Sequence, residues 1–404
     1  RGLMGFGAAV SEHPLATHAV GEVVGQVLEQ VGPAPDVAVV FATGGFAGAM
    51  EDIASTVRAT LAPSTLVGAT AVSVLAGGHE VEDRAAVALF AADWGGRLRT
   101  GARGARAVRF DAQRDGEGWR LLGSDDVAVP GATLLLLADP FTFPIDGFLH
   151  RLHRQAPGVR VVGGMASAAR GAGGNRLVAD QTVTDRGAVG LFFPPGVPVH
   201  PLLAQGCRPL GEALVVTASR GNLVEEIAGR PALDRLNELI EGADHRDRAL
   251  MGHGLHLGPA AHEARGAFVA GDFLVRTVLG MERASGSVAV GGDVPVGTTV
   301  QFHVRDPQTA DEQLRSVLAD QPGRAALVFT GDGRGQALFG GPHHDAEVVH
   351  EHVDRGATAG MFCTGEIGPV AGQSFVHALA TALLASLTAP AARALDPDFH
   401  AVEK

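Results

Sequence analysis

The stretch Val159-Arg-Val-Val-Gly-Gly-Met-Ala-Ser167 ends the clearest copy of the pattern that decides this fold. Before it come the apolar run Leu134-Leu-Leu-Leu-Ala138 and a helical segment near Ile145 to Gln155. The copy therefore predicts a strand, a polar loop, a helix and a second strand that runs into a Gly-rich turn. Short apolar runs without alternation are typical of strands that are covered on both faces.

The same pattern occurs twice more along the chain. The first copy has Val37-Ala-Val-Val-Phe41, a helix from about Glu51 to Ala62, and Leu66-Val-Gly-Ala-Thr70. The third copy has Ala326-Leu-Val-Phe-Thr330, a helix near Asp345 to Arg355, and Gly360-Met-Phe-Cys-Thr-Gly-Glu-Ile367. Three strand–helix–strand units are therefore expected.

Other segments predict elements outside these units. Apolar residues recur at helical spacing from His18 to Val31. Residues from Gly286 to Val304 alternate around Gly291-Gly292-Asp293, which favours an antiparallel pair joined by a tight turn. The apolar run from Ser374 to Leu387 is expected to be a helix that packs in a core.

The units and the alternating strands together indicate an α+β fold. We expect two related halves, each a mixed β-sheet flanked by helices, with the sheets packed face to face in an αββα-like arrangement. A change of composition near Phe193 to Pro198 favours a boundary between the halves. The expected domains are residues 1–204 and residues 205–404.

Composition excludes several classes of function. The chain has 404 residues and a net charge of −12, its sole lysine is Lys404, and it has no tyrosine. Without an internal lysine it has neither a Schiff-base lysine nor a Walker A loop. An acidic chain without a basic run argues against nucleic acid, and no apolar run is long enough to cross a membrane. We expect no cofactor.

Two cysteines and many histidines give no metal site. Cys207 and Cys363 lie far apart without a CxxC pattern, so neither zinc nor a disulfide framework is expected, and a cytoplasmic location is the natural inference. The histidines at residues 343–352 and 253–262 lack the spacing of HExxH. Their expected roles are solvation or internal hydrogen bonds.

Glycine-framed residues are the first candidates for binding. Gly163 and Gly164 follow a strand, where they serve either as a tight turn or as amides that cradle an anion. Arg334 stands between two glycines in Gly331-Asp-Gly-Arg-Gly335, on a loop expected to be exposed. It is either a clamp for a carboxylate or a solvated arginine in a hairpin turn.

Two further residues interrupt apolar surroundings. Glu366 stands in an apolar stretch, where a buried carboxylate must be paired or functional, and we expect it at a ligand site. Cys363 ends a predicted strand, and His377 on the following predicted helix is its nearest candidate base. A buried structural cysteine is the favoured interpretation of Cys363.

The order of motifs along the chain resembles the FIST domain in its N- and C-terminal parts, over residues 15–388. The motifs that carry the resemblance are Val67-Gly-Ala-Thr70, Gly163-Gly-Met-Ala-Ser167, Gly187-Ala-Val-Gly-Leu191, Thr217-Ala-Ser-Arg-Gly-Asn222, Arg305-Asp306, Gly333-Arg-Gly335 and Gly365-Glu-Ile-Gly-Pro369. The resemblance implies an intracellular sensory module that binds small ligands such as amino acids. The family often has cysteine where this chain has Gly331 and Ala69, which weakens a cysteine-enzyme interpretation.

A ligand site between the two halves is the resulting hypothesis. Arg334 would clamp a carboxylate, Glu366 would bind an amine or polar group, and the remaining contacts would come from Asn222, Ser167 and the amides of Gly163 and Gly164. Output would pass through a protein partner, and homo-oligomer formation stays open. The alternatives are an enzyme that uses Cys363 and His377 on an acyl-type substrate, and a ligand-free protein-interaction scaffold.

Overall fold

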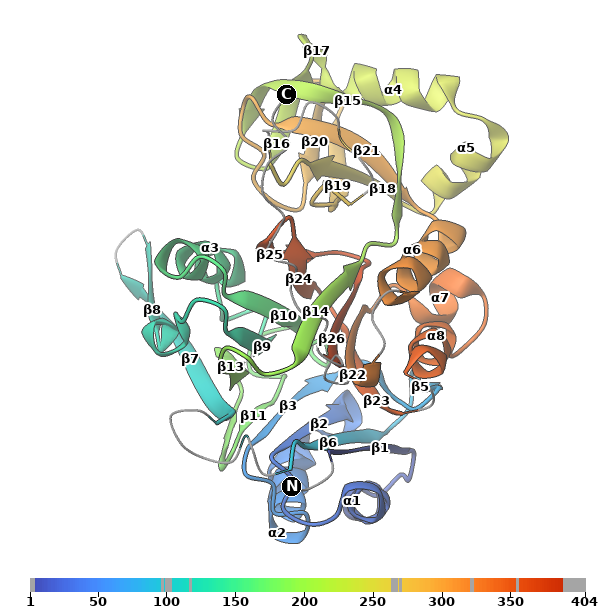
Figure 1. Cartoon of the computed structure of the whole chain (residues 1–404). Coiled ribbons are helices and arrows are strands. Elements are labelled where there is room, and N and C mark those ends of the chain that lie inside the picture. Colours follow the sequence, from blue (N-terminus) through green and yellow to red (C-terminus); the bar gives the residue numbers. More distant parts are fainter. Residues whose placement is uncertain are drawn as a thin grey trace, which may run out of the picture.

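The computed structural model describes residues 4–95, 98, 104–115, 118–262, 268, 271–319, 323–353 and 356–387. Figure 1 shows two parts, a body of three sheets and a barrel that stands at one end of it. The barrel comprises residues 207–305, and the rest of the described chain forms the body. The fold is α+β with mixed sheets flanked by helices, as expected.

All three strand–helix–strand units are confirmed. They are β2 (Val37–Thr43), α2 (Met50–Thr60) and β3 (Leu66–Ala71); β9 (Thr133–Ala138), α3 (Ile145–Gln155) and β10 (Arg160–Met165); and β22 (Gly323–Gly331), α8 (His344–His352) and β23 (Ala357–Cys363). In each unit the two strands are parallel neighbours. A parallel pair needs a crossover helix, and the helical stretch of each copy supplies it.

A hairpin follows each unit and joins the sheet of a different unit. The hairpins are β4 (Val74–Ala76) with β5 (His79–Val81), β11 (Leu177–Ala179) with β12 (Thr182–Thr184), and β24 (Glu366–Val370) with β25 (Gln373–His377). β4 pairs with β23, β11 with β3, and β24 with β10. The hairpin after the first unit thus extends the sheet of the third unit, the hairpin after the second extends the first sheet, and the hairpin after the third extends the second sheet. The exchange of hairpins is therefore cyclic among the three units.

After its hairpin the chain returns to its own unit. The returning strands are β6 (Val87–Asp93), β13 (Ala188–Phe193) and β26 (Thr381–Leu387). Each pairs antiparallel with the first strand of its unit, β2, β9 or β22. The outer strands are β1 (Gly5–Ser11), β7 (Arg106–Asp115) with β8 (Gly118–Leu122), and β14 (Val199–Ala204).

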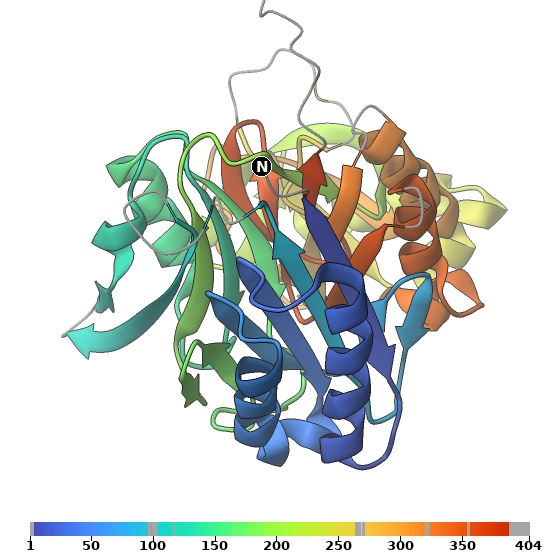
Figure 2. The same cartoon turned by 60° about the horizontal axis from the view of Figure 1, so that its bottom comes forward.

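Helices cover the outer faces of the three sheets. α1 (Ala16–Val31) and α2 pack on the first sheet, as Figure 2 shows, and α3 packs on the second. α6 (Pro307–Ala319) and α8 pack on the third. Short helical turns complete the body: η1 (Gly44–Ala49), η2 (Ser124–Val127) and α7 (Gly335–Phe339). Within the described ranges we find no helix whose length and hydropathy would let it cross a bilayer.

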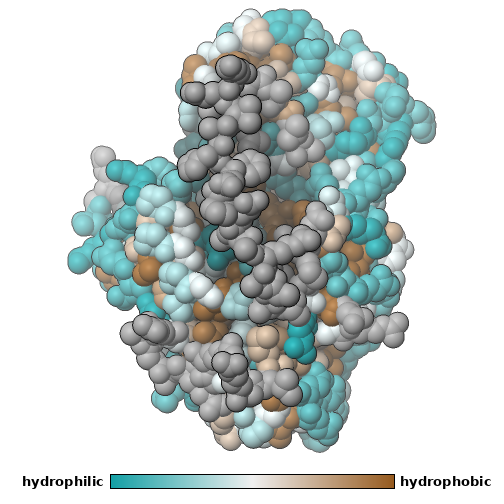
Figure 3. Space-filling model, viewed as in Figure 1, coloured by the Kyte–Doolittle hydropathy of each residue, from teal (hydrophilic) through white to brown (hydrophobic). Residues whose placement is uncertain are grey.

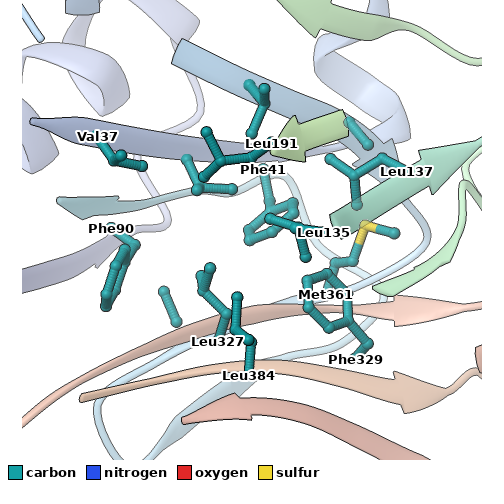
Figure 4. Close-up of a cluster of buried hydrophobic side chains, with 14 of the residues drawn as sticks. Val37, Phe41, Phe90, Leu135, Leu137, Leu191, Leu327, Phe329, Met361 and Leu384 are labelled. Atoms are coloured by element: carbon teal, nitrogen blue, oxygen red, sulfur yellow. The ribbon is translucent and has the colours of Figure 1, made fainter. Parts of the chain in front are cut away.

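One apolar core lies between the inner faces of all three sheets. Figure 4 shows Phe41 of the first sheet, Leu135 of the second and Phe329 of the third in the same cluster. The rings of Phe41 and Phe329 meet edge to face, with centroids 6.0 Å apart. Because each sheet is buried on both faces, its strands are the continuous apolar runs that the sequence shows.

The barrel is inserted between β14 and α6. Its elements are β15 (Cys207–Arg220), β16 (Leu223–Ile227), β17 (Arg230–Pro231), α4 (Ala232–Gly242), α5 (His245–Gly252), β18 (Leu255–Pro259), β19 (Arg276–Glu282), β20 (Ser287–Val290) and β21 (Thr299–Arg305). The strand order is β15-β21-β18-β19-β20-β16, and a β15–β16 pairing closes it. It encloses its own apolar core.

Two predicted elements are wrong. The helix expected over Ser374–Leu387 is instead β25 and β26, because the apolar run pairs with β22 and β14 inside a sheet and tertiary pairing overrides helix propensity. The alternating segment Gly286–Val304 does contain two strands, β20 and β21. They are not neighbours, since β18 and β19 lie between them in the barrel.

Candidate functional site

The barrel meets the body along a surface that we call the seam. On β21, Phe302 and Val304 point into the barrel core, so the alternate residues His303 and Arg305 lie on the outer face. His256 on β18 stands opposite His303 in the antiparallel register. Gly333, just after β22, lies across the seam, where its carbonyl oxygen accepts a 2.9 Å hydrogen bond from Arg305 Nη2. Leu379, in the connection from β25 to β26, packs close to Gly333.

Arg334 lies in the body beside the seam and is fully buried. Its Nε and Nη2 donate to the two carboxylate oxygens of Asp345 at 2.7 and 2.8 Å, and Nη1 donates to Leu379 O at 3.2 Å. Asp345, in the first turn of α8, also accepts hydrogen bonds from Thr330 and Thr381. Burial raises the pKa of Asp345, but the Arg334 guanidinium outweighs this and holds that pKa well below its usual range.

This geometry corrects the expected environment of Arg334. The loop was expected to expose the guanidinium, whereas Arg334 and Asp345 are both 0% exposed. Since all three guanidinium nitrogens of Arg334 already donate within the chain, the residue joins α7, α8 and the β25–β26 connection. A ligand role for Arg334 stays a prediction, and it would require the packing that buries the guanidinium to open.

Glu366 is buried at the start of β24, as the sequence suggested. It is 1% exposed, and its Oε2 accepts a 2.8 Å hydrogen bond from the Ala380 amide. Burial raises the pKa of Glu366 well above its ordinary value, and nearby Arg334 opposes this only in part. This shift favours the protonated form of Glu366, which can donate as well as accept a hydrogen bond.

Glu366 and Arg334 hold a strained residue between them. Leu379 has φ +65°, a left-handed conformation that is rare for a bulky side chain. Its carbonyl oxygen accepts from Arg334, and the next amide, that of Ala380, donates to Glu366. Strain of this kind persists where the surroundings fix it, and it is common at ligand clamps and switch segments.

Gly163 and Gly164 lie inside β10, not in a turn. β9 and β24 flank them on both sides, so their backbone groups face neighbouring strands. A Cβ on Gly163 would stand 2.0 Å from Leu136 O, and one on Gly164 would stand 2.2 Å from Cys363 Sγ. Close packing therefore requires glycine at both positions, and their expected contact with a ligand stays a prediction.

The six predicted ligand residues do not all meet. Gly164 is the register partner of Glu366, and Ser167 joins the same region through a hydrogen bond from its Oγ to Phe362 O. Asn222 lies in the barrel, between β15 and β16, and its side-chain amide donates to Val290 O at 3.1 Å. No contact among the described residues brings Asn222 to the other five.

The alternative catalytic pair is buried in the structure. Cys363 is 0% exposed, and burial together with Glu366 raises its thiol pKa well above the ordinary value. His377 lies on strand β25, not on a helix; its Nε2 hydrogen-bonds Gly368 O, and burial lowers its pKa to about 4. A catalytic cysteine needs an accessible thiolate, so this environment disfavours an enzyme that uses Cys363.

On the barrel side of the seam, some buried polar side chains have hydrogen-bond partners and others have none. His303 Nδ1 hydrogen-bonds Gln301 O at 2.9 Å. In the described part of the chain, both ring nitrogens of His256 and Nε of Arg305 are buried and have no hydrogen-bond partner. Burial, together with the charge of Arg305, lowers the pKa of His256 to about 4, so this imidazole is neutral.

A pocket of about 440 Å³ opens at the seam. Its lining comes from β14, α6, the β24–β25 turn and the barrel: Leu203, Ala204, Gln205, Gly271, Asp272, Gln313, Ser316, Val317, Pro369, Val370 and Ala371. Figure 3 shows the recess between barrel and body, where apolar residues gather below a largely hydrophilic surface. A pocket of this size between two bodies suits a small ligand.

Gln205 links this pocket to the buried polar residues. Its side-chain amide donates to Phe273 O at 2.9 Å, and the Phe273 ring lies 5.3 Å from the ring of His303. The next residue, Gly206, packs so closely on Arg334 that a Cβ would stand 2.5 Å from its Nη1. The segment Gln205–Gly206 therefore contacts the pocket, the barrel residue Phe273 and Arg334 of the body.

Several of these residues were missed by the sequence reasoning. In the sequence, Arg305 stands out only as part of the Arg305-Asp306 motif, and Asp345 only as the start of a predicted helix. The sequence does contain a pattern that could have identified Arg305. Gln301, His303 and Arg305 alternate with apolar residues, which predicts a strand with one polar face. Within the described residues no group of three or more His, Cys, Asp or Glu is arranged to hold a metal ion.

Comparison with known proteins identifies the family. Residues 36–230 match the FIST N domain, and residues 232–369 match the FIST C domain. The expected division between residues 204 and 205 stays a prediction. The uncharacterised proteins Mb0898c of Mycobacterium bovis and MT0897 of Mycobacterium tuberculosis are each 38% identical to this chain over 381 residues, which cover 93% of this chain and 96% of theirs.

A second protein of Mycobacterium tuberculosis, the uncharacterised Rv0628c, is 35% identical over 381 residues, which cover 93% of this chain and 97% of the relative. The matches therefore run through both the body and the barrel. FIST domains are a sensory, signal-transduction family. The chain belongs to the FIST family, with a FIST N and a FIST C domain that together span most of its length.

Proposed function

We propose that this protein is a sensor that binds a small ligand, an amino acid or another small carboxylate, at the seam and signals through a protein partner. The observation that carries the proposal is the pocket of about 440 Å³, which has walls from both the body and the barrel. A ligand that contacts two bodies favours one relative position of them over others, and a partner can sense that position.

The pocket lining supports a ligand with both polar and apolar parts. Gln205, Gln313 and Ser316 provide amide and hydroxyl groups, and Asp272 provides a carboxylate that suits an amine. Val317 and Val370 provide apolar surface. An amino acid has this combination of groups, which is why we place it first among the candidates.

Thermal-shift and calorimetric titrations with single amino acids and small carboxylates test the proposal. Ser316→Trp fills the pocket from α6 and is expected to abolish the stabilisation that a bound ligand gives the wild type. Glu312→Trp is the matched control, because Glu312 is an exposed residue of the same helix outside the lining. Equal responses of both variants to every compound that stabilises the wild type, or no response of the wild type at all, would refute binding in this pocket.

A further inference from the structure

The barrel face of the seam contains buried polar atoms that nothing in the described chain satisfies. His256 is 3% exposed, and neither Nδ1 nor Nε2 has a hydrogen-bond partner among the described residues; the same holds for Arg305 Nε. A buried unsatisfied polar group costs about 1–3 kcal/mol, and native proteins contain few of them. Three such atoms on one face of two neighbouring strands indicate a missing partner.

His256 and Arg305 lie on one face of two neighbouring strands. His256 stands opposite His303 in the β18–β21 register, and Arg305 follows His303 by two residues, on the same side of β21. Arg305 is close enough to His256 for its charge to lower the pKa of that imidazole. Its Nη2 donates to Gly333 O across the seam, while its Nε is buried and has no hydrogen-bond partner among the described residues.

The charges at this place favour an anion. Cys207, opposite Arg305 in the β15–β21 register, is a neutral thiol whose pKa burial raises to about 12. His303 is neutral because burial lowers its pKa to about 4. The acidic neighbour of Arg305 is Asp332, and burial raises the pKa of this carboxyl, which weakens it as a counter-charge, although Arg305 opposes the shift. The positive charge of Arg305 is thus only partly balanced.

Arg334, by contrast, is fully buried and already bonded inside the chain. Each of its three guanidinium nitrogens donates to Asp345 or Leu379, and its charge is matched by the Asp345 carboxylate. Arg305 has one described bond, to Gly333 O, and a buried Nε without one. Of these two arginines, Arg305 is the one that can bind an incoming group without losing an internal salt bridge.

We propose that His256 and Arg305 form an oxyanion subsite at the seam, which holds the carboxylate or phosphate group of the small ligand. The inference rests on the proposed function, since it names the chemical group of the ligand and the residues that bind it. Arg305 Nε–H and one ring N–H of His256 donate to two oxygens of the same oxyanion, as charge-assisted hydrogen bonds. Because these nitrogens are covered in the structure, entry of the oxyanion requires the barrel to shift against the body.

The first test is the stability of the unliganded protein. His256→Leu removes two unsatisfied nitrogens and keeps a similar volume, so urea denaturation should show equal or higher stability than the wild type. His303→Leu, at the register partner of His256 on β21, is the matched control, and it should be less stable than the wild type, because the bond from His303 to Gln301 O is lost. A marked loss of stability in His256→Leu would contradict the proposal, since it would show that His256 has a structural partner.

The second test is binding of inorganic phosphate and of succinate, measured by isothermal titration calorimetry at pH 7. The wild type should bind at least one of them, and His256→Leu and Arg305→Lys should each weaken binding by about tenfold or more. Arg305→Lys keeps the charge and removes Nε. The control is Arg276→Lys, at an arginine whose Nη1 donates to Val376 O across the same seam. Binding of phosphate alone or succinate alone supports the subsite and identifies the class of oxyanion.

Proton uptake on binding gives a readout that a structural role would not produce. An oxyanion beside His256 raises the imidazole pKa toward 7, so titrations in buffers of different ionisation enthalpy should show uptake in the wild type but not in His256→Leu. No binding of either probe, or equal binding by wild type and both variants, overturns the subsite. If amino acids still bind and Ser316→Trp still abolishes their effect, the subsite fails while the proposed function stands.

Discussion

Ser167 Oγ donates a 2.6 Å hydrogen bond to the carbonyl oxygen of Phe362 and accepts one of 2.9 Å from the amide of Val72. Val72 and Ser167 follow the second strands of the first two units, and Phe362 lies at the end of the second strand of the third. One hydroxyl therefore joins all three units at the points where their hairpins cross to other sheets. This contact explains Ser167 as a structural link, independently of any ligand.

Ser167→Ala should lower the free energy of unfolding by about 1–3 kcal/mol, because the amide of Val72 and the carbonyl of Phe362 both lose their partner. Ser167→Thr keeps the hydroxyl and serves as the control. Urea denaturation at neutral pH measures both variants. If Ser167→Ala is as stable as the wild type but fails to respond to ligands, the residue acts in binding and the structural account is wrong.

Removing one charge of the buried Arg334–Asp345 pair should lower the free energy of unfolding more than replacing both residues with apolar ones. Asp345→Asn leaves a buried guanidinium without its counter-charge, for which about 3–5 kcal/mol of destabilisation is expected. The double variant Arg334→Met/Asp345→Leu removes both charges, so it should be less destabilised than Asp345→Asn. Chemical denaturation of the two variants and the wild type makes this comparison.

Equal or greater destabilisation of the double variant would contradict this account of the pair. It would mean that the hydrogen bonds from Arg334 to Leu379 O and from Thr330 to Asp345 matter more than charge compensation. The comparison also bears on function: a variant that stays folded without Arg334 and still binds the ligand excludes the clamp that the sequence predicted.

Gly164→Ala should destabilise the fold by overpacking. The added methyl carbon would stand 2.2 Å from Cys363 Sγ, so either β10 or β23 must shift, at a cost of about 1–3 kcal/mol. Adding Cys363→Ala to Gly164→Ala removes the sulfur and should restore part of the loss. Thermal denaturation of the two single variants and the double variant gives the coupling, and strictly additive effects would show that the two positions do not compete for space.

The three units were predictable because each depends on a local pattern of apolar runs and helical spacing. The exchange of hairpins was not, since nothing local distinguishes a hairpin that joins its own sheet from one that joins another. The last apolar run was misassigned because alanine- and leucine-rich strands that are buried on both faces look like a core helix. The pairing of β26 with β22 and β14 shows that this run is a strand and not a helix.

The candidate site was predictable at single residues and not in its connections. Glu366 was predictable because a carboxylate in an apolar run is expected to be buried, and a buried carboxylate must be paired or functional. Arg334 was found from its glycines, but its partner Asp345 lies eleven residues further on, on a helix whose packing against β22 brings the two together. The sequence predicts a solvated or internally hydrogen-bonded His256, whereas this side chain is 3% exposed, because burial depends on tertiary packing that the local sequence does not show.

Both cysteines should resist alkylation in the folded protein. Cys207 and Cys363 are buried, and burial raises both thiol pKa values, that of Cys207 to about 12. Iodoacetamide at pH 7.5 should label neither within the time in which a free thiol reacts fully, and both in urea. Mass spectrometry of the digested protein gives the extent at each site. Rapid labelling of Cys363 under native conditions would return the cysteine-enzyme alternative to consideration.

Glu80 joins the first unit to the third and should make stability depend on pH. It lies on β5, and its carboxylate accepts hydrogen bonds from the amides of His343 and Ala346 at the start of α8. Burial, followed by repulsion from Asp345, raises the pKa of Glu80 from its ordinary value of 4.5 to about 7. The folded protein therefore holds a proton on Glu80 that the unfolded chain has released.

The stability that comes from this proton is fully present below pH 4.5 and is lost as the pH rises through about 7. Its size is on the order of 3 kcal/mol. Buried His256, His303 and His377 act in the opposite sense, because their pKa values near 4 remove stability as the pH falls below 6.5. The effect of Glu80 is therefore isolated by comparing the wild type with Glu80→Gln at each pH.

Glu80→Gln cannot lose a proton, so the stability of the wild type relative to this variant should decline between pH 4.5 and pH 8. Urea denaturation at half-unit steps of pH measures the difference, and the exposed Glu312→Gln on α6 controls for the change of one charge. A difference that stays constant over this range would show that Glu80 is ionised in the folded protein throughout. In that case the helix N-terminus of α8 and its two amide donors stabilise the carboxylate more than burial and Asp345 destabilise it.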